Sequence, residues 1–289
     1  MPSVTVAATL VRRAATALAT LPGLGAATVL YAATVERRWL HVTTRHLAIA
    51  HLPPAWDGMR VAQLSDMHLG SLGAPYATMR HAVARIVALR PDMIALTGDF
   101  TERGNRQPLD FLAPLAHVAP TFAVLGNHDY FTSPRAADAL ATHLRSLGIC
   151  VLRNAVAPFT FRGVAAPVVG FDDALYGPGA DISGVVASTP DGVPLVLAHQ
   201  PDLVDRFPPH WAGLTLSGHT HAAQVRLSPF RNVDWPNLRQ VSDMYSRYLR
   251  GFFHTRGNGL YVNRGLGTAR WPIRLFARPE LTILVLHCQ

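Results

Sequence analysis

The stretch MRVAQLSDMHLG, residues 59–70, contains an apolar run of strand length that ends abruptly in Asp66 and His68. Four later stretches, at residues 92–100, 121–130, 193–202 and 213–224, repeat this plan. The polar residues at their ends are, in chain order, Asp99; Asn127, His128 and Asp129; His199; and His219 and His221. Side chains of the types that bind metal ions therefore follow five predicted strands.

Two segments between these strands have apolar residues at helical spacing, at 74–90 and 133–148. Each stops near a proline or a glycine, which is typical of a helix end. Alternation of strand and helix predicts an α/β domain with a partly parallel sheet. Because ligands gather at the carboxyl ends of strands in such sheets, we expect the five polar clusters to converge on one place.

The spacing inside the clusters favours a shared site. In extended backbone, residues i and i+2 point to the same face, so we expect Asp66 to lie beside His68, and His219 beside His221. Glycines stand directly before three clusters, where a sharp turn or a close backbone approach is required: Gly98, Gly126 and Gly218. Ligands of Asp, Asn and His type without thiolates favour manganese, iron or zinc over calcium.

Each motif taken alone has an ordinary structural explanation. An Asp-x-His pair is common by chance, a lone histidine such as His199 often lies in a core or on a surface, and Asn127 could simply form a turn. Five such motifs in order, each at a strand end, make the metal site the better interpretation.

Composition limits the class of protein. The 289 residues, 49% of them hydrophobic, suffice for one large domain or two smaller ones. The net charge is +8, but the chain has no lysine and no run of five basic residues, so nucleic acid is not a favoured partner. Cys150 and Cys288 form neither a zinc motif nor a disulfide framework, and we expect both to be small buried residues.

The first forty residues differ from the rest. No charged residue occurs at 14–35, and arginines flank this apolar segment on both sides. Its length suits a bilayer span. A membrane anchor, an export signal and a soluble Ala-rich helix all compete; we expect an uncleaved or inefficiently cleaved anchor within residues 1–40. The balance of arginines leaves its orientation open. Residues 41–58 predict an edge strand and a turn that lead into the globular body.

Five sequence blocks resemble those of the calcineurin-like metallophosphoesterase family. They are DMH (66–68), GDFTERG (98–104), GNHD (126–129), the single His199 and GHTH (218–221). The resemblance extends from about residue 41 to the end, and stretches such as RGLGTARWPIRLFARPELTIL are similar to a bacterial branch with an N-terminal export or membrane segment. It implies a four-layer α-β-β-α sandwich of two mixed sheets over 41–289. It also implies a location at the bacterial inner membrane, with the exported face favoured.

The resemblance further implies a dinuclear site. Asp99 would bridge two divalent ions of manganese, zinc or iron, with magnesium as a further candidate, and a metal-bridging hydroxide would attack phosphorus. The implied ligands of the first ion are Asp66, His68, Asp99 and His221, and those of the second are Asp99, Asn127, His199 and His219.

Three further residues receive catalytic roles from the resemblance. His128 would sit beside the leaving oxygen, Glu102 would orient His128, and Arg103 would clamp the phosphate. The family's protein phosphatases have Asp where this chain has the longer Glu102, which puts the geometry of that contact in question.

Ala222 and Ala223 stand where glycines are expected, so we expect a small change in loop packing.

The substrate remains open at this stage. Loops 228–257 and 171–179 are candidate rims of a site for a phosphorylated small molecule or a lipid-like substrate. Replacing Trp235, Tyr245 and Tyr248 by Ala is expected to impair hydrolysis of a lipid-like substrate. The leading function is hydrolysis of phosphodiesters or phosphomonoesters. The alternatives are a UDP-2,3-diacylglucosamine-type pyrophosphate hydrolase, a non-catalytic metal-binding scaffold, and a nuclease that rests on net charge alone.

Overall fold

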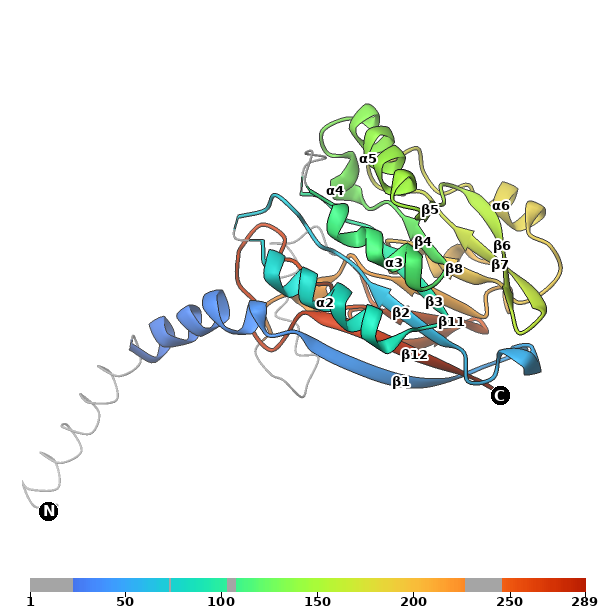
Figure 1. The fold of residues 1–289 in the computed structure, drawn as a ribbon, viewed down its shortest axis with the longest axis horizontal. Helices are drawn as coiled ribbons and strands as arrows, with labels where there is room; N and C mark the ends of the chain where they lie inside the picture. The colour runs from blue at the N-terminus through green and yellow to red at the C-terminus, as the bar shows by residue number, and fades with distance from the viewer. Residues whose placement is uncertain (1–22, 73, 103–107, 227–245) are drawn as a thin grey trace, which may run out of the picture.

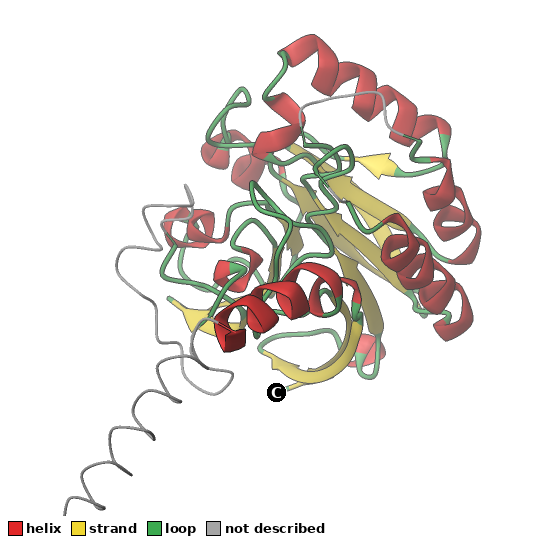
Figure 2. Cartoon of the chain, turned by 90° about the vertical axis from the view of Figure 1, so that its left-hand side faces the viewer, coloured by secondary structure: helices red, strands yellow, loops and turns green. Residues whose placement is uncertain are grey.

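The computed structural model describes residues 23–72, 74–102, 108–226 and 246–289. Two six-stranded sheets face each other, and helices cover their outer faces (Figures 1 and 2). Both sheets contain parallel and antiparallel neighbours. The predicted four-layer α/β sandwich of two mixed sheets is therefore confirmed.

The first sheet combines the N-terminal half of the chain with its last strand. Its order is β1 (His41–Ile49), β12 (Glu280–Cys288), β2 (Arg60–Leu64), β3 (Met93–Thr97), β4 (Thr121–Val124) and β5 (Cys150–Val151). Strands β2 to β5 run parallel, whereas β12 is antiparallel to β2 and parallel to β1. The predicted edge strand after residue 40 is thus confirmed as β1.

The second sheet uses the C-terminal half. Its order is β10 (Gly251–Thr255), β11 (Asn258–Val262), β9 (Leu214–Ser217), β8 (Leu195–Leu197), β7 (Val164–Gly170) and β6 (Ala155–Phe161). Its four central strands are parallel, and an antiparallel hairpin partner closes each edge. The carboxyl ends of β8 and β9 lead directly into the predicted histidine clusters.

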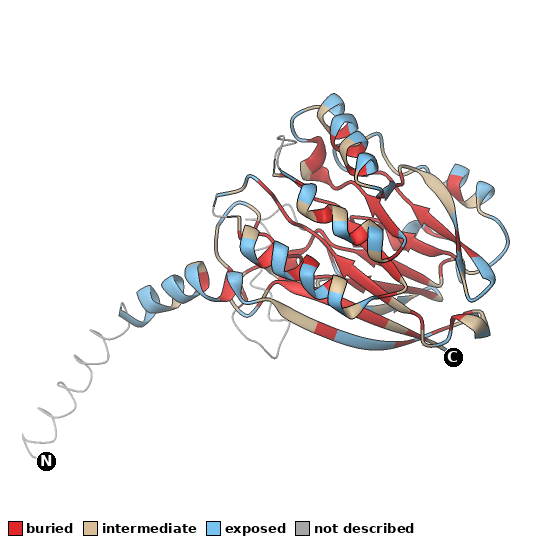
Figure 3. Cartoon of the chain, in the orientation of Figure 1, coloured by how far each residue is buried: buried red, intermediate tan, exposed pale blue. Residues whose placement is uncertain are grey.

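Buried side chains explain why central strands such as β3 are largely apolar. In β3, Ile94 and Leu96 pack against the outer helices, whereas Met93 and Ala95 pack between the sheets. Because both faces are covered, the strands are continuous apolar runs without alternation. Figure 3 shows the buried strands between helices whose outer faces are exposed.

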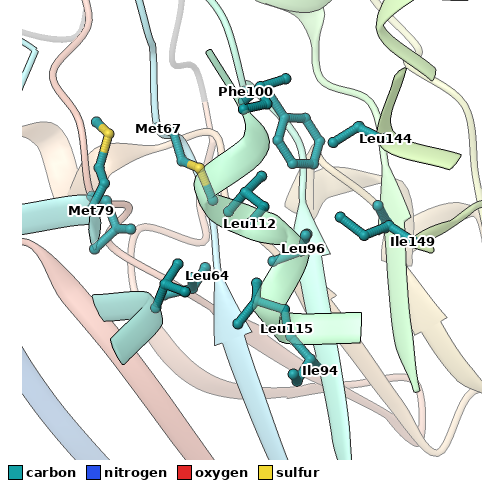
Figure 4. Close-up of a cluster of buried hydrophobic side chains, with 14 of the residues drawn as sticks. Leu64, Met67, Met79, Ile94, Leu96, Phe100, Leu112, Leu115, Leu144 and Ile149 are labelled. Carbon is teal, nitrogen blue, oxygen red and sulfur yellow. The ribbon is translucent and has the colours of Figure 1, made fainter. Parts of the chain in front are cut away.

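Helices α2 (Tyr76–Leu89), α3 (Ala113–Val118) and α5 (Pro134–Ser146) cover the outer face of the first sheet. Figure 4 shows side chains of this layer, among them Leu64 of β2 beside Leu115 of α3. Helix α6 (Ile182–Ser188) and the 3-10 helix η4 (Pro201–Arg206) cover the second sheet. The helices predicted at 74–90 and 133–148 are thus confirmed. At the start of α5, Ser133 caps the helix by accepting the amide of Ala136.

The N-terminal segment is only partly described. Residues 23–34 form a helix that leads away from the body (Figure 1), with Leu24, Val29 and Leu30 exposed. Its end contacts the body, because the carbonyl of Ala32 accepts the amide of Arg274. Within the described ranges, no helix combines the length and apolarity that a membrane span requires. Residues 14–22 of the predicted anchor lie outside these ranges.

The prediction for the cysteines is wrong. Cys150 and Cys288 are both free and exposed. Cys150 begins the two-residue edge strand β5 and Cys288 ends β12. Cys150 lies in an edge strand and Cys288 is the last residue of its strand, so both side chains are outside the core.

Candidate active site

The predicted clusters meet at one end of the sandwich. They follow the carboxyl ends of β2, β3 and β4 in the first sheet and of β8 and β9 in the second. All seven predicted metal ligands are buried: Asp66, His68, Asp99, Asn127, His199, His219 and His221. Burying a polar side chain without a partner costs free energy, so these seven side chains must interact with one another or with a bound ion.

Four of these side chains form a compact group. Asp66, His68, Asp99 and His221 each offer one ligand atom, and these atoms lie within 4.8 Å of one another. The Nε2 atoms of His68 and His221 are 2.9 Å apart, and His221 Nε2 lies 3.3 Å from Asp66 Oδ1. This buried group of two carboxylates and two imidazoles is a metal-binding cluster by its donor chemistry.

A second group adjoins the first. Asn127 Oδ1 lies 3.1 Å from His199 Nε2 and 3.0 Å from His219 Nδ1. Oδ2 of Asp99 lies 3.2 Å from His199 Nε2 and 3.4 Å from His68 Nε2. One carboxylate oxygen of Asp99 therefore faces both groups.

The backbone at these ligands is not extended, which corrects the reasoning from spacing. The backbone dihedral φ is +52° at Asp66, +48° at His68, +71° at His219 and +50° at His221. The side chains therefore project from left-handed turns rather than from strands, a conformation that costs non-glycine residues free energy. A long-range hydrogen bond ties two of these turns together: His219 N donates to Asp66 Oδ1 over 2.9 Å.

The glycines before the ligands are required by close approach, as predicted. A Cβ atom on Gly98 would lie 2.7 Å from both Gly126 N and His199 Nδ1. On Gly126 it would overlap Asp99, and on Gly218 it would overlap Asp66. Glycine lets these loops pass against the ligands themselves.

Hydrogen bonds at the far ring nitrogens orient two of the histidines. His199 Nδ1 lies 2.7 Å from the carbonyl of Thr97, and His68 Nδ1 lies 2.7 Å from Glu102 Oε2. Donation from Nδ1 leaves the Nε2 lone pairs directed into the clusters, the usual arrangement for metal-binding histidines. Burial is the main cause that lowers the pKa of His219 to about 3, so its ring is neutral and able to bind a cation. The residues present therefore fit divalent ions.

Glu102 and His128 lie next to these clusters. Oε2 of Glu102 is 3.4 Å from His128 Nδ1, in agreement with the predicted orienting contact. Burial disfavours a charged His128, but Asp99 and Glu102 outweigh it and raise the pKa of His128 to about 9. A ring with a raised pKa beside the clusters can hold a proton and donate it. Arg103 lies outside the described residues.

A cavity of about 470 Å³ opens onto these groups. Its wall contains predicted residues, but also four that the sequence analysis did not single out: Phe131, Thr132, Ala269 and Arg270. Phe131 and Thr132 directly follow the GNHD block, and Arg270 stands within the quoted stretch RGLGTARWPIR. Only their position next to the recognised blocks could have pointed to these residues. The sequence does not indicate which residues near a metal ligand face the cavity.

The prediction that Tyr248 lies on a rim is wrong. Tyr248 is buried, and its hydroxyl donates to Asp205 Oδ1 over 2.7 Å, so it belongs to the core rather than to a rim. Trp235 and Tyr245 lie outside the described residues. In loop 171–179, Tyr176 packs edge-on against Phe131 with ring centroids 4.9 Å apart.

The two alanines after the last histidine adopt left-handed conformations, with φ of +53° at Ala222 and +62° at Ala223. Glycine would adopt them without strain, which explains the expectation of glycine at these positions. Thr220 is turned away from the clusters, and its hydroxyl donates to the carbonyl of Leu249.

The chain also matches known proteins. Residues 59–223 match the model of the calcineurin-like phosphoesterase family. The metallophosphoesterase YkuE of Bacillus subtilis is 28% identical over 266 residues, which cover 89% of this chain and 88% of that protein. The phosphodiesterase YaeI of Escherichia coli is 30% identical over 280 residues, 94% of this chain and 96% of its relative. The UDP-2,3-diacylglucosamine pyrophosphatase LpxG of Chlamydia muridarum is 27% identical over 81% of this chain and 84% of its own length. With its buried Asp and His cluster, the chain belongs to the calcineurin-like phosphoesterase family and is a metal-dependent phosphoric ester hydrolase.

Proposed function

We propose that this enzyme hydrolyses phosphodiesters or phosphomonoesters with two divalent ions. Asp66, His68, Asp99 and His221 would hold the first ion, and Asp99, Asn127, His199 and His219 the second. The observation that carries this assignment is the position of Asp99 Oδ2, within 3.4 Å of His68 Nε2 and 3.2 Å of His199 Nε2. A single oxygen between two ligand groups suits a bridging carboxylate.

A pair of divalent ions would stabilise the charge on the attacking and leaving oxygens of an in-line displacement. Manganese, zinc and iron suit the mixed nitrogen and oxygen donors, and magnesium is the further candidate.

Protein groups around the ions would position the substrate and move the proton. His128 would give its proton to the leaving oxygen, and Glu102 would hold the ring in place. Arg270, at the wall of the same cavity, would bind a phosphate oxygen, as would Arg103.

A nucleotide-lipid pyrophosphate, of the kind named for the LpxG relative, is the more specific substrate that we propose to test. The exposed Leu24, Val29 and Leu30 on helix 23–34 favour association of the N-terminal segment with the bacterial inner membrane, through residues 14–35. The globular residues 41–289 would then act at the membrane surface.

The experiment is a hydrolysis panel with the full-length protein in detergent. Manganese, zinc, iron and magnesium are each combined with a diester, a monoester and a nucleotide-lipid pyrophosphate. Asp99→Asn and Asn127→Ala serve as matched controls. We expect metal-dependent turnover by the wild type and a loss of at least a hundredfold in both controls.

A second measurement does not depend on turnover. Ions that bind the folded state raise the unfolding temperature, so manganese or zinc should stabilise the wild type more than Asp99→Asn. If wild type and controls are equally inert with every metal and equally unaffected by metals in stability, the proposed dinuclear site is wrong.

A further inference from the structure

A row of three aromatic rings leads away from the clusters. The rings of His128 and Phe131 are 4.1 Å apart between centroids and tilted by 42°. Tyr176 follows, 4.9 Å from Phe131 and perpendicular to it. Since His128 and Phe131 both line the cavity, the row begins inside the site and extends outward along one side.

The outer part of this row is exposed. Phe131 is 41% exposed, Tyr176 53% and the adjacent Leu175 52%. Folding alone gives no reason to leave two packed rings and a leucine in water beside a catalytic cavity. Adjoining exposed apolar side chains of this kind mark ligand-binding surfaces.

Buried polar groups hold the loop that carries Tyr176. The carboxylate of Asp173 is fully buried, and one of its oxygens accepts the backbone amides of Leu175, Tyr176 and Gly177 at 3.1, 2.5 and 2.8 Å. Its other oxygen accepts from Gln200, the residue after His199. The loop is thus fixed relative to the metal-ligand loops.

The support of Phe131 is equally rigid. Its neighbour Tyr130 is buried and donates to Asp172, which also accepts Nε of Arg153 over 2.8 Å. Exposed rings on a fixed frame can bind a flat group with little loss of conformational entropy.

We propose that Phe131 and Tyr176 form a subsite for a planar, ring-containing leaving group. This proposal rests on the proposed function, because His128 would protonate the leaving oxygen and so places the leaving group at the start of the row. The enzyme then prefers phosphodiesters whose leaving alcohol carries an aromatic ring next to the ester oxygen.

The test uses two substrates that differ in ring area. Methyl 4-nitrophenyl phosphate has a leaving group with one ring, and methyl 4-methylumbelliferyl phosphate has one with two fused rings. Both leave as stabilised phenolates, so neither depends strongly on a proton donor and the comparison reports the ring contact. Removal of one aromatic contact lowers kcat/KM by about tenfold at most. We expect Phe131→Ala and Tyr176→Ala to lower kcat/KM about tenfold for the two-ring substrate and about threefold or less for the one-ring substrate.

Two variants serve as controls. Phe131→Tyr keeps the ring and should retain the preference of the wild type. Phe252→Ala removes a similarly exposed ring, 39% exposed, that does not line the cavity, and should change neither substrate.

The outcomes separate this proposal from the proposed function. If the wild type turns over both substrates but Phe131→Ala and Tyr176→Ala lower both equally, the leaving-group subsite is wrong while the phosphoesterase assignment stands. If the wild type is inert with every metal, the proposed function fails first. Inhibition by inorganic phosphate, which would occupy only the metal end of the cavity, should stay within twofold of the wild type in both variants.

Discussion

Glu102 shares one carboxylate oxygen between two histidines. Its Oε2 atom lies 2.7 Å from Nδ1 of His68 and 3.4 Å from Nδ1 of His128. Burial would raise the pKa of Glu102, but hydrogen bonds from His128 and His68 outweigh it and lower that pKa to about 2. The carboxylate is therefore ionised at neutral pH, and its shorter contact is to the proposed metal ligand rather than to the proposed acid.

Replacing Glu102 by Gln should affect both histidines. The neutral amide cannot stabilise a protonated His128, so the basic limb of the pH profile of kcat/KM should move to lower pH. The amide oxygen of Gln is a weaker acceptor for His68 Nδ1 than the carboxylate, so metal affinity should fall by about tenfold, the lower end of the usual effect of such contacts. Metal titrations and pH profiles of Glu102→Gln and Glu102→Asp check this. An unshifted pH profile with normal metal affinity would show that the shared oxygen has no role.

Replacing His128 by Ala should matter most for poor leaving groups. General acid catalysis contributes about 10² to 10⁴-fold when the leaving oxygen needs a proton. A nitrophenolate leaves without one, so we expect a loss of at least a hundredfold for an alkyl diester and about tenfold or less for a 4-nitrophenyl diester. Steady-state kinetics with both substrates provide the measurement. Equal losses for the two would indicate a structural role for His128.

Arg270 should contribute chiefly to phosphate binding. The amide of Gln224 fixes its loop, with Oε1 accepting the amide of Ala269 at 2.9 Å and Nε2 donating to the carbonyls of Ala269 and Trp271. Arg270→Ala should raise KM about tenfold, the loss expected for one charge-assisted hydrogen bond. Gln224→Leu, which loosens the loop that carries Arg270, should also raise KM, but by less than Arg270→Ala.

The measurement for Arg270 is KM together with inhibition by inorganic phosphate, which should weaken in parallel. Arg162→Ala is the control, because Arg162 lies in the turn between β6 and β7 with its guanidinium over the ring of Phe161. If Arg270→Ala leaves both constants unchanged, Arg270 does not contact the phosphate.

The sequence allowed the convergence of the ligand loops to be predicted, but not the backbone that produces it. Apolar runs covered on both faces are recognisable as strands, and parallel strands present their carboxyl ends together. The left-handed turns at Asp66 and His219 were not predictable, since non-glycine residues adopt them only when surrounding contacts compensate for the strain. Asp66 and His68 therefore lie together as predicted, but they project from left-handed turns and not from an extended strand.

Residues that depend on long-range packing escaped prediction as well. The insertion of β12 between β1 and β2 brings the two ends of the chain into one sheet, and no local pattern indicates it. The arginines and aromatics of its segment predict a rim position for Tyr248, whereas the structure buries it. Its burial follows from its place in the apolar cluster on the outer face of the second sheet, where the partly buried Phe253 packs beside it with ring centroids 5.1 Å apart.

The ion pair between the buried Glu280 and the partly buried Arg264 should make the free energy of unfolding depend on pH in acid. Glu280 accepts Nε of Arg264 at 3.0 Å, its backbone amide at 3.1 Å, and the hydroxyl of Tyr261 at 3.2 Å. Burial opposes ionisation of Glu280, but Arg264 outweighs it and lowers the pKa of Glu280 below its usual 4.5. A lowered pKa means that the stabilisation is fully present above about pH 4.5 and is lost as the pH falls towards the pKa of the folded state.

Glu280→Gln should thus reduce the free energy of unfolding by about 3 kcal/mol at pH 7, the usual loss when one partner of a buried pair is removed. The difference from the wild type should shrink as the pH falls below about 4.5 towards the lowered pKa of Glu280, because protonation then removes its charge. Tyr261→Phe, which removes a single neutral donor, should cost only about 1 kcal/mol. Urea unfolding of the three proteins at several pH values measures both effects, and a difference between wild type and Glu280→Gln that is constant with pH would contradict the role of the charge.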